Sequence, residues 1–275
     1  MNKVEKLTKK VYSKMPEREW IRVVKDPFHL LEFNTTMRFL KKYLPKRGLI
    51  LDAGGGPGRY SIELAKLGYD VILLDLVKEN LDLAKKQIKK AKVDNKIKDI
   101  LEGSIADLSK FKGNTFDAVI CLGGPLSHVN PKSNREKAVR ELIRVAKKNA
   151  PIFISVMGKF ATLMAAPRRW IKEYNNRKHA FDITLKGEDY MWHNKYYAHF
   201  FLREEFEELI KSTGINILET VGLEGLASPD PDAFNLLPKE YPKAYKNWME
   251  LHYKICTIPT IVDISQHMMI IGRKK

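Results

Sequence analysis

The stretch LILDAGGGPGRYSIELAKLGYDVILLDL, residues 49–76, decides the fold that we expect. Its first five residues, LILDA, predict a buried strand. A glycine-rich loop then leads into an amphipathic helix, which has Pro57 near its start and Gly68 after its end. The run DVILLDL predicts a second strand. Four glycines lie within the five positions from Gly54 to Gly58, so we expect a ligand to approach bare backbone at this loop.

Beyond this stretch, apolar runs and amphipathic helices continue to alternate. Further strands are predicted in the runs IKDILEG, FDAVICL, APIFISVM, INILETVGL and HMMIIGRKK. Helices are predicted between most of them, as in KENLDLAKKQIKKA, SNREKAVRELIRVAKKN and REEFEELIKSTG. Such an order requires a mostly parallel sheet with helices on both faces. We therefore expect an α/β fold with a doubly wound, mostly parallel seven-stranded sheet and an antiparallel strand near the C-terminus.

The regular pattern covers only part of the chain, and the remainder predicts additions to a single domain, 1–275. Residues 1–45 read as an N-terminal helical extension, and residues 46–158 form the ligand-binding core. The pattern lapses over residues 159–200, which we interpret as a lid-like insertion rich in aromatic residues and histidines. Residues 201–275 return to helix and strand, with a second lid-like addition, a helical excursion, over residues 228–259.

The composition, 44% hydrophobic and 30% charged residues, is typical of a soluble globular protein. No apolar run approaches the roughly 20 residues of a membrane span, and the first residues lack the apolar segment of a secretory signal. We therefore expect a cytoplasmic protein that does not bind membranes. Cys121 and Cys256 lie far apart in apolar surroundings, so we expect no disulfide and no metal site.

The formal net charge of +16 raises the question of an anionic partner. Much of the charge is Lys on helix faces, as in KKQIKKAK, and such faces are usually solvated surface. The segment from Lys159 to Lys178 differs, because its six basic residues face a single acid, Glu173, with Trp170 and Tyr174 between them. Because of this segment, RNA stays among the partners that the sequence allows.

The residues around the glycine loop restrict its ligand. A phosphate-binding P-loop needs Gly-Lys-Ser/Thr, whereas Gly58 is followed by Arg59 and Tyr60. A dinucleotide fingerprint needs a small residue where Arg59 stands. Asp52, just before the loop, would repel a pyrophosphate but suits a ligand with an ammonium group, such as S-adenosylmethionine. Asp75 at the end of the second strand can accept hydrogen bonds from ribose hydroxyls, a role that would serve NAD equally well.

On these residues the chain resembles the class I S-adenosylmethionine-dependent methyltransferases. The resemblance rests on LDAGGGPGRY, the acid in LLDL, the runs LEGSIADL and FDAVICLGGPLSHV, and ELIRVAKKNAPIFISV. It implies S-adenosylmethionine as cofactor and S-adenosylhomocysteine as product. The implied cofactor residues are Asp52, Gly54, Gly55, Gly56, Gly58 and Arg59 near the methionine part, Asp75 and Leu76 at the ribose, Ser104 and Ile105 at the adenine, and Leu122 and Gly123 on the methyl-transfer side.

One position departs from the family pattern. The family often has Gly-Asp after the third strand, where the Asp accepts a hydrogen bond from the adenine amino group. This chain has Gly103 and Ser104 instead. A serine hydroxyl accepts more weakly, and the nearby Asp107 is an alternative acceptor.

We expect the acceptor of the methyl group to be a small molecule with a nucleophilic nitrogen or oxygen. Positioning alone can supply roughly 7–11 kcal/mol to such an in-line displacement, and a general base adds roughly 10²- to 10⁴-fold. The candidate catalytic residues are His128, Tyr197 and His193. The Asn/Asp-Pro-Pro-aromatic element of enzymes that methylate base amines is missing after the fourth strand, and Cys121 reads as a core residue.

Three alternatives stay open at this point. The first is an RNA methyltransferase that uses the Lys159–Lys178 segment. The second is a non-catalytic protein that binds S-adenosylmethionine, and the third is an NAD-dependent oxidoreductase, which Asp52 and Arg59 disfavour. The sequence predicts no oligomeric state.

Overall fold

A computed structural model of the protein describes residues 2–169, 171–190 and 197–275. Seven strands within these ranges form one sheet in the order β3-β2-β1-β4-β5-β9-β8. Their bounds are β1 Leu49–Ala53, β2 Asp70–Asp75, β3 Ile97–Glu102, β4 Ala118–Cys121, β5 Pro151–Met157, β8 Asn216–Gly222 and β9 His267–Arg273.

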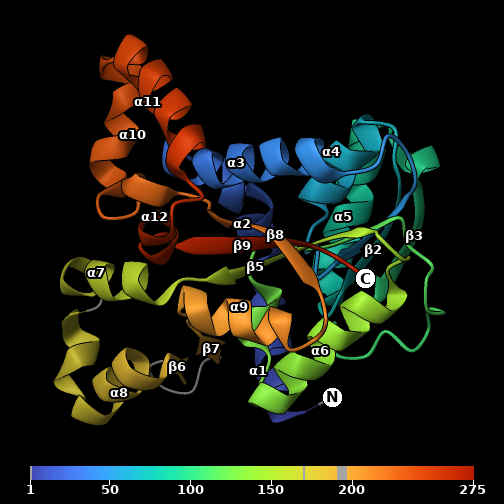
Figure 1. Ribbon diagram of the computed structural model, residues 1–275, viewed down its shortest axis with the longest axis horizontal. Coiled ribbons are helices and arrows are strands. Elements are labelled where there is room, and N and C mark those ends of the chain that lie inside the picture. The colour runs from blue at the N-terminus through green and yellow to red at the C-terminus, as the bar shows by residue number, and fades with distance from the viewer. Residues whose placement is uncertain (1, 170, 191–196) are drawn as a thin grey trace.

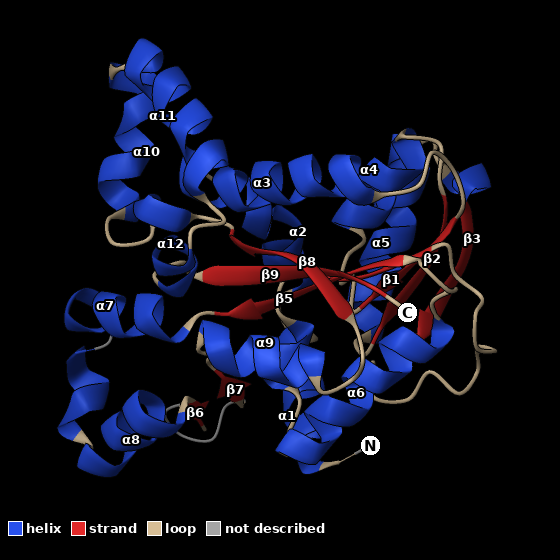
Figure 2. Ribbon diagram, viewed as in Figure 1, coloured by secondary structure: helices blue, strands red, loops and turns tan. Residues whose placement is uncertain are grey.

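The strands pair in parallel from β3 to β5, and β9 then runs antiparallel to both β5 and β8. The expected α/β class, the seven strands and the antiparallel strand are therefore confirmed. The antiparallel strand lies one position inside the edge, because β8 covers it. Figure 2 shows this sheet as the centre of the molecule, between two layers of helices.

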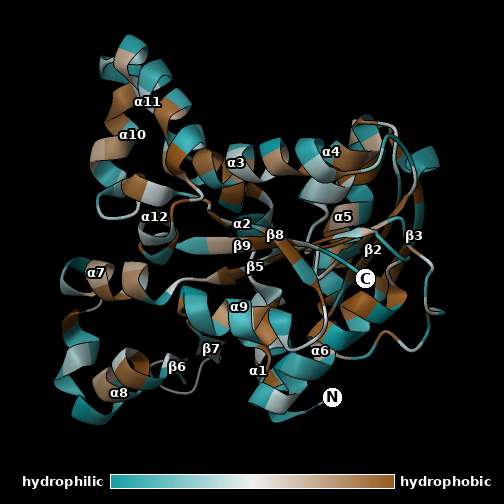
Figure 3. Cartoon of the chain, in the orientation of Figure 1, coloured by the Kyte–Doolittle hydropathy of each residue, from teal (hydrophilic) through white to brown (hydrophobic). Residues whose placement is uncertain are grey.

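Helices pack on both faces of the sheet (Figure 1). One face is covered by α3 (Pro27–Tyr43), α4 (Arg59–Lys66) and α5 (Lys78–Ala91), and the other by α6 (Lys132–Val145) and α9 (Arg203–Lys211). Successive residues of a strand point to opposite faces. Ile50 accordingly belongs to the core beneath α3 and α4, and Leu51 to the core beneath α6 and α9. Figure 3 shows the resulting pattern, with apolar residues along the strands and hydrophilic ones on the outer surfaces of the helices.

Three short helical elements precede α3: α1 (Lys3–Tyr12), α2 (Pro16–Ile21) and η1 (Arg22–Val24). The first begins with a reciprocal capping box, in which Asn2 and Glu5 each accept a hydrogen bond from the other's backbone N–H. α1 then reaches the ends of two strands, because Lys9 pairs with Glu102 and Tyr12 bonds to His128. The segment thereby lies over the carboxyl edge of the sheet, where ligands bind in open α/β folds.

Two groups of elements extend the domain on the β5 side of the sheet (Figure 1). After β5 come α7 (Lys159–Arg169), η4 (Ile171–Asn175), α8 (Arg177–Phe181), the π-helical turn η5 (Asp182–Lys186), and the short strands β6 (Glu188–Asp189) and β7 (Ala198–His199). After β8 come η6 (Gly225–Ala227), α10 (Pro231–Glu240), α11 (Pro242–Ile255) and α12 (Pro259–Asp263). Phe234 of α10 packs edge-on against Phe28 of α3, which joins the second group to the core.

Two further turns lie in the core connections, η2 (Asp94–Lys96) before β3 and η3 (Pro125–His128) after β4. No helix in the described ranges has both the length and the apolar character needed to cross a membrane.

Candidate active site

The glycine loop folds tightly against the end of β2. The Gly54 N–H donates to the carbonyl of Leu74 at 2.7 Å, and Gly54, Gly56 and Gly58 all have left-handed backbone, with φ of 81°, 56° and 81°. A side chain at Gly54 would lie 2.6 Å from the ring of Pro125. Glycine is therefore required here by backbone conformation and by space together.

A cavity with about 1020 Å³ of empty space, including the solvent at its mouth, opens between this loop, the ends of the first four strands and the N-terminal helices. The core contributes Gly54, Gly55, Gly56, Pro57, Arg59, Tyr60, Asp75, Leu76, Val77, Asn80, Gly103, Ser104, Ile105, Leu122, Gly123, Pro125, His128 and Val129. The N-terminal segment contributes Glu5, Thr8, Tyr12, Glu19, Arg22 and Val23.

Asp75 ends β2 at the wall of this cavity. Its carboxylate accepts hydrogen bonds from the backbone N–H of Gly56 at 2.8 Å and of Val77 at 2.9 Å, and from the Asn80 amide at 3.2 Å. Burial raises the pKa of Asp75 against these donors. Since a carboxylate has about four lone-pair positions, Asp75 can hold the loop and still accept from one ribose hydroxyl.

Asp52 lies beneath the glycine loop. Asp52 is fully buried below the loop and is not among the residues that line the cavity. It accepts a hydrogen bond from Ser61 Oγ at 2.6 Å, and burial raises its pKa to about 7. A side chain at Gly55 would collide with its carboxylate. Asp52 therefore supports the loop from beneath, while its Oδ1 is buried without a hydrogen-bond partner in the described part of the chain, and its contact with the cofactor stays a prediction.

Gly58 also lies away from the cavity wall. A side chain there would come within 3.2 Å of Leu73 and 3.4 Å of Ala84. Gly58 thus allows the start of α4 to pack closely against β2 and α5, which is a role in helix packing and not in ligand contact.

Arg59 does line the cavity, and it connects two parts of the chain. Its guanidinium group stacks 3.7 Å from the ring centre of Trp20 in α2. Two of its nitrogens also donate to the Trp20 carbonyl, at 2.9 and 2.7 Å. Arg59 therefore holds α2 against the glycine loop through this stacking and these two hydrogen bonds.

The predicted adenine residues, Ser104 and Ile105, lie at the end of β3 and line the cavity together with Leu76. The Ser104 hydroxyl donates to Glu5 Oε1 at 2.6 Å and accepts from the Ala106 N–H at 3.1 Å. Asp107, the alternative acceptor, is exposed, is not among the residues of this cavity, and accepts from the Ser109 N–H. Leu122 and Gly123 line the cavity after the end of β4, and their place on the methyl-transfer side stays a prediction.

His128 lines the cavity beyond the end of β4. Its Nδ1 lies 2.8 Å from the carbonyl oxygen of Tyr197, and its Nε2 lies 3.0 Å from the Tyr12 hydroxyl. A carbonyl only accepts, so Nδ1 carries the proton and the Nε2 lone pair faces Tyr12. Burial lowers the pKa of His128. The imidazole is therefore a neutral base with a fixed tautomer at neutral pH.

The prediction for the Tyr197 side chain needs correction. Its phenol is 1% exposed, accepts a hydrogen bond from Arg135 at 2.7 Å and is absent from the cavity wall. Burial raises its pKa, which opposes a role as a base. Tyr197 contributes instead through its carbonyl, which orients His128. His193, the third candidate, lies outside the described residues.

The N-terminal part of the wall contains charges that the sequence patterns did not reveal. Glu19 and Arg22 face the cavity 3.5 Å apart, and Arg22 also pairs with Glu32 at 2.8 Å. Burial raises the pKa of Glu19. The capping pattern of Asn2 and Glu5 predicts where α1 begins, but no local signal indicates that α1 and α2 fold over the strand ends.

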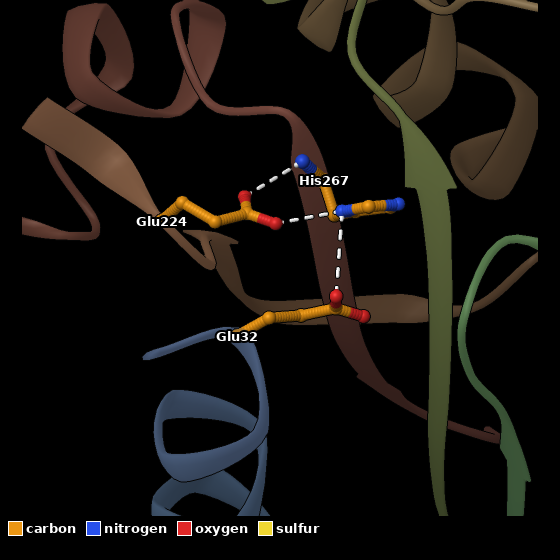
Figure 4. Close-up of side chains that lie close together, drawn as sticks. All are labelled: Glu32, Glu224 and His267. Carbon is orange, nitrogen blue, oxygen red and sulfur yellow. Dashed lines mark hydrogen bonds and ion pairs between the residues drawn. The ribbon is translucent and has the colours of Figure 1, made fainter. Parts of the chain in front are cut away.

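Behind Arg22 lies a buried charge cluster of Glu32, Glu224 and His267 (Figure 4). The His267 Nδ1 is 2.6 Å from Glu224 and 3.7 Å from Glu32. Burial opposes the charge of His267, but the two carboxylates outweigh it and raise its pKa. The two carboxylates face the His267 ring and the Arg22 guanidinium, and we interpret the cluster as a support that holds Arg22 in place.

Comparisons with known proteins agree with this geometry. Residues 50–149 match the methyltransferase-domain family. A glycine/sarcosine N-methyltransferase of Aphanothece halophytica is 30% identical over 111 residues, 40% of this chain and 40% of that protein. A ubiquinone biosynthesis O-methyltransferase of Rickettsia canadensis is 28% identical over 182 residues, 63% of this chain and 65% of that protein. The chain thus spans less than two thirds of the length of either relative.

Among solved structures, a SAM-dependent methyltransferase from Methanosarcina mazei superposes with a TM-score of 0.58 at 20% identity, covering 86% of this chain and 96% of that one. This likeness concerns the fold. Together with the methyltransferase-domain match over residues 50–149, the strand order and the glycine cradle, it supports a class I S-adenosylmethionine-dependent methyltransferase fold for this chain. The comparisons support S-adenosylmethionine-dependent methyltransferase activity with S-adenosylmethionine as cofactor, and the cavity offers that cofactor a bare backbone cradle and the carboxylate of Asp75.

Proposed function

We propose that the enzyme transfers the methyl group onto a nitrogen or oxygen of a small-molecule acceptor that binds beside His128. The observation that carries this proposal is the cover formed by α1, α2 and η1 over the strand ends. His128, Leu122 and Gly123 lie in the same cavity as the glycine loop and the N-terminal residues. An acceptor must therefore fit within a covered cavity, which favours a compact molecule over a polymer. The names of the two relatives refer to N- and O-methylation of small molecules, in line with this class.

The methionine part of the cofactor is proposed to lie between the glycine loop and η1. Because Asp52 is not on the cavity wall, the charges available to an amino acid group are those of Arg22 and Glu19. Arg22 suits the carboxylate, since a guanidinium binds carboxylates with two parallel hydrogen bonds. Glu19 suits the ammonium group. The cluster of Glu32, Glu224 and His267 then acts indirectly, by fixing Arg22.

The cofactor supplies the activated methyl group, and the residues of the chain are proposed to orient the acceptor and to take its proton. His128 is the proposed base because its Nε2 lone pair faces the cavity side chain of Tyr12 and burial keeps the ring neutral. The Tyr197 carbonyl prevents the ring from turning over. Once the acceptor has displaced the Tyr12 hydroxyl from Nε2, a hydroxyl acceptor would pass its proton to Nε2 as its oxygen takes the methyl group. An ammonium acceptor would pass one proton to Nε2 before transfer, which frees the nitrogen lone pair for attack, and such base catalysis contributes roughly 10²- to 10⁴-fold.

RNA remains the alternative acceptor, and the basic Lys159–Lys178 segment supports it less than its sequence suggested. Lys159 is buried and donates to the Leu185 carbonyl at 3.1 Å, and Lys178 pairs with Asp182 at 2.7 Å. Arg168 lies 3.5 Å from Asp230. None of these residues is among those lining the cavity. Part of the charge is thus paired within the chain and is away from the methyl-transfer side.

The test is a transfer assay with S-adenosylmethionine carrying a labelled methyl group and cell extract separated into small-molecule, RNA and protein fractions. We expect label in the small-molecule fraction, and its loss when His128 is replaced in the variant His128→Asn. The variant Gly54→Ala, which is expected to lose the cofactor, is the negative control. Label that enters RNA, with retention of RNA at moderate salt, would replace this proposal by the RNA alternative.

A further inference from the structure

The adenine end of the cavity lacks the carboxylate that β3 would ordinarily provide, because Ser104 stands there. In the structure a carboxylate of the N-terminal helix α1 nevertheless lies beside Ser104. Glu5 of α1 accepts a hydrogen bond from Ser104 Oγ at 2.6 Å and lines the same cavity as Ser104 and Ile105. The acid is therefore present in space although it is absent from the local sequence.

The position of Glu5 is fixed by contacts on both sides of it. Its Oε2 accepts from the Asn2 N–H at 2.8 Å in the capping box, while its Oε1 accepts from Ser104. Further along α1, Lys9 pairs with Glu102 at the end of β3, and Tyr12 bonds to His128. Asn2 also donates to the Asn130 carbonyl at 3.3 Å. The helix is thus held against the ends of both β3 and β4.

Glu5 retains the capacity to bind a further donor. A carboxylate has about four lone-pair positions, and the structure gives two bonds to Glu5. The other acids of the cavity wall are placed elsewhere: Asp75 holds the glycine loop, and Glu19 lies beside Arg22. Among the described residues of the wall, Glu5 is therefore the carboxylate available at the end of β3.

We propose that Glu5 accepts a hydrogen bond from the 6-amino group of the cofactor's adenine, and that α1 thereby selects an amino-purine over an oxo-purine. Ser104 acts as a positioning residue, because its hydroxyl holds the carboxylate toward the base. This inference rests on the assignment of the cofactor and is independent of the acceptor. It makes the N-terminal helix part of the cofactor site and not only its cover.

The test is titration calorimetry of the full chain with S-adenosylhomocysteine and with its deaminated analogue, S-inosylhomocysteine, in which oxygen replaces the amino group. The wild-type protein should prefer the adenosine ligand by at least roughly tenfold, because the analogue sets a carbonyl against a carboxylate. The variant Glu5→Gln should bind S-adenosylhomocysteine roughly tenfold more weakly. It should bind the analogue as well as or better than the wild type does, because an amide can donate to the carbonyl.

Glu5→Gln suits this test because glutamine also completes a capping box, so α1 is retained. Glu17→Gln is the matched control, since Glu17 is an exposed acid on the adjoining helix and is absent from the cavity wall. Its affinities for both ligands should equal those of the wild type. If Glu5→Gln weakens both ligands equally, or neither, Glu5 does not contact the base and the inference is overturned. Failure of the wild type to bind S-adenosylhomocysteine would instead contradict the cofactor assignment itself.

Discussion

The cofactor cavity has a floor and a cover, and the two are built differently. The floor, residues 49–76, is continuous in sequence and is held by backbone bonds such as the one from Gly54 to Leu74. The cover, residues 3–24, lies outside that stretch and is held by side chains, as in the pairs Glu5 with Ser104, Tyr12 with His128 and Trp20 with Arg59. Segments held by a few side-chain contacts open more easily than a buried sheet does. We therefore expect the cover to move when the cofactor enters or leaves.

The largest effect is expected from breaking the floor at Gly54. In Gly54→Ala the new methyl group would lie 2.6 Å from Pro125, in backbone that already disfavours a side chain by roughly 1–2 kcal/mol. We expect calorimetry to detect no binding of S-adenosylhomocysteine. Gly68→Ala is the matched control, because Gly68 has φ of 96° but nothing within 4 Å of the added carbon. Equal affinity of both variants would show that the tight contact is unimportant.

His128 lies where the floor meets the cover, and its replacement should reduce turnover by roughly 100-fold or more if it is the base. Burial lowers its pKa below the usual 6.5, and only the neutral ring can accept a proton. Turnover of the wild type should therefore be constant around neutral pH and fall as the pH drops through the His128 pKa. Initial rates across pH for the wild type and His128→Asn test this. An acid limb that persists in the variant would assign it to another group.

Asp75 tests the ribose anchor of the floor. Asp75→Ala removes a carboxylate that holds the glycine loop and faces the cavity, and we expect cofactor affinity to fall more than tenfold, or about 1.4 kcal/mol. Asp70→Ala, at the exposed start of the same strand, should leave the affinity unchanged. An unchanged affinity for Asp75→Ala would mean that the ribose lies elsewhere.

The smallest effect is expected behind the cover, at His267. Its folded pKa is raised above the unfolded value by Glu32 and Glu224 against burial. The resulting stability is fully present below the unfolded pKa, near 6.5, and is lost as the pH rises through the folded pKa. The melting temperature of the wild type should therefore fall over this range more than that of His267→Gln. Parallel curves for the two proteins would exclude this contribution.

The sequence predicted the floor well because its determinants are local. The alternation of apolar strands and amphipathic helices predicts the sheet. The four glycines indicate a loop whose backbone conformation other residues rarely adopt. The placement of Gly54, Gly56 and Asp75 on the cavity wall follows from that conformation. The position of Asp52 could not be predicted from the sequence in the same way. A residue two positions before a loop can lie either beside the ligand of that loop or beneath the loop itself.

The cover could not be predicted, because it depends on contacts between residues about 100 positions apart, such as Glu5 with Ser104 and Tyr12 with His128. The pattern of α1 indicates an amphipathic helix but not the surface on which it packs. The same holds for Tyr197, which the sequence placed near the substrate. Its backbone does reach His128, whereas its side chain turns into the core toward Arg135.

The central claim is that the floor and the cover together form a cofactor cavity. Calorimetry of the full chain with S-adenosylhomocysteine and, separately, with NAD tests this claim most directly. We predict binding of S-adenosylhomocysteine and none of NAD, because the shape of the glycine loop and the side chain of Arg59 do not fit a pyrophosphate site. Binding of NAD without binding of S-adenosylhomocysteine would contradict the account.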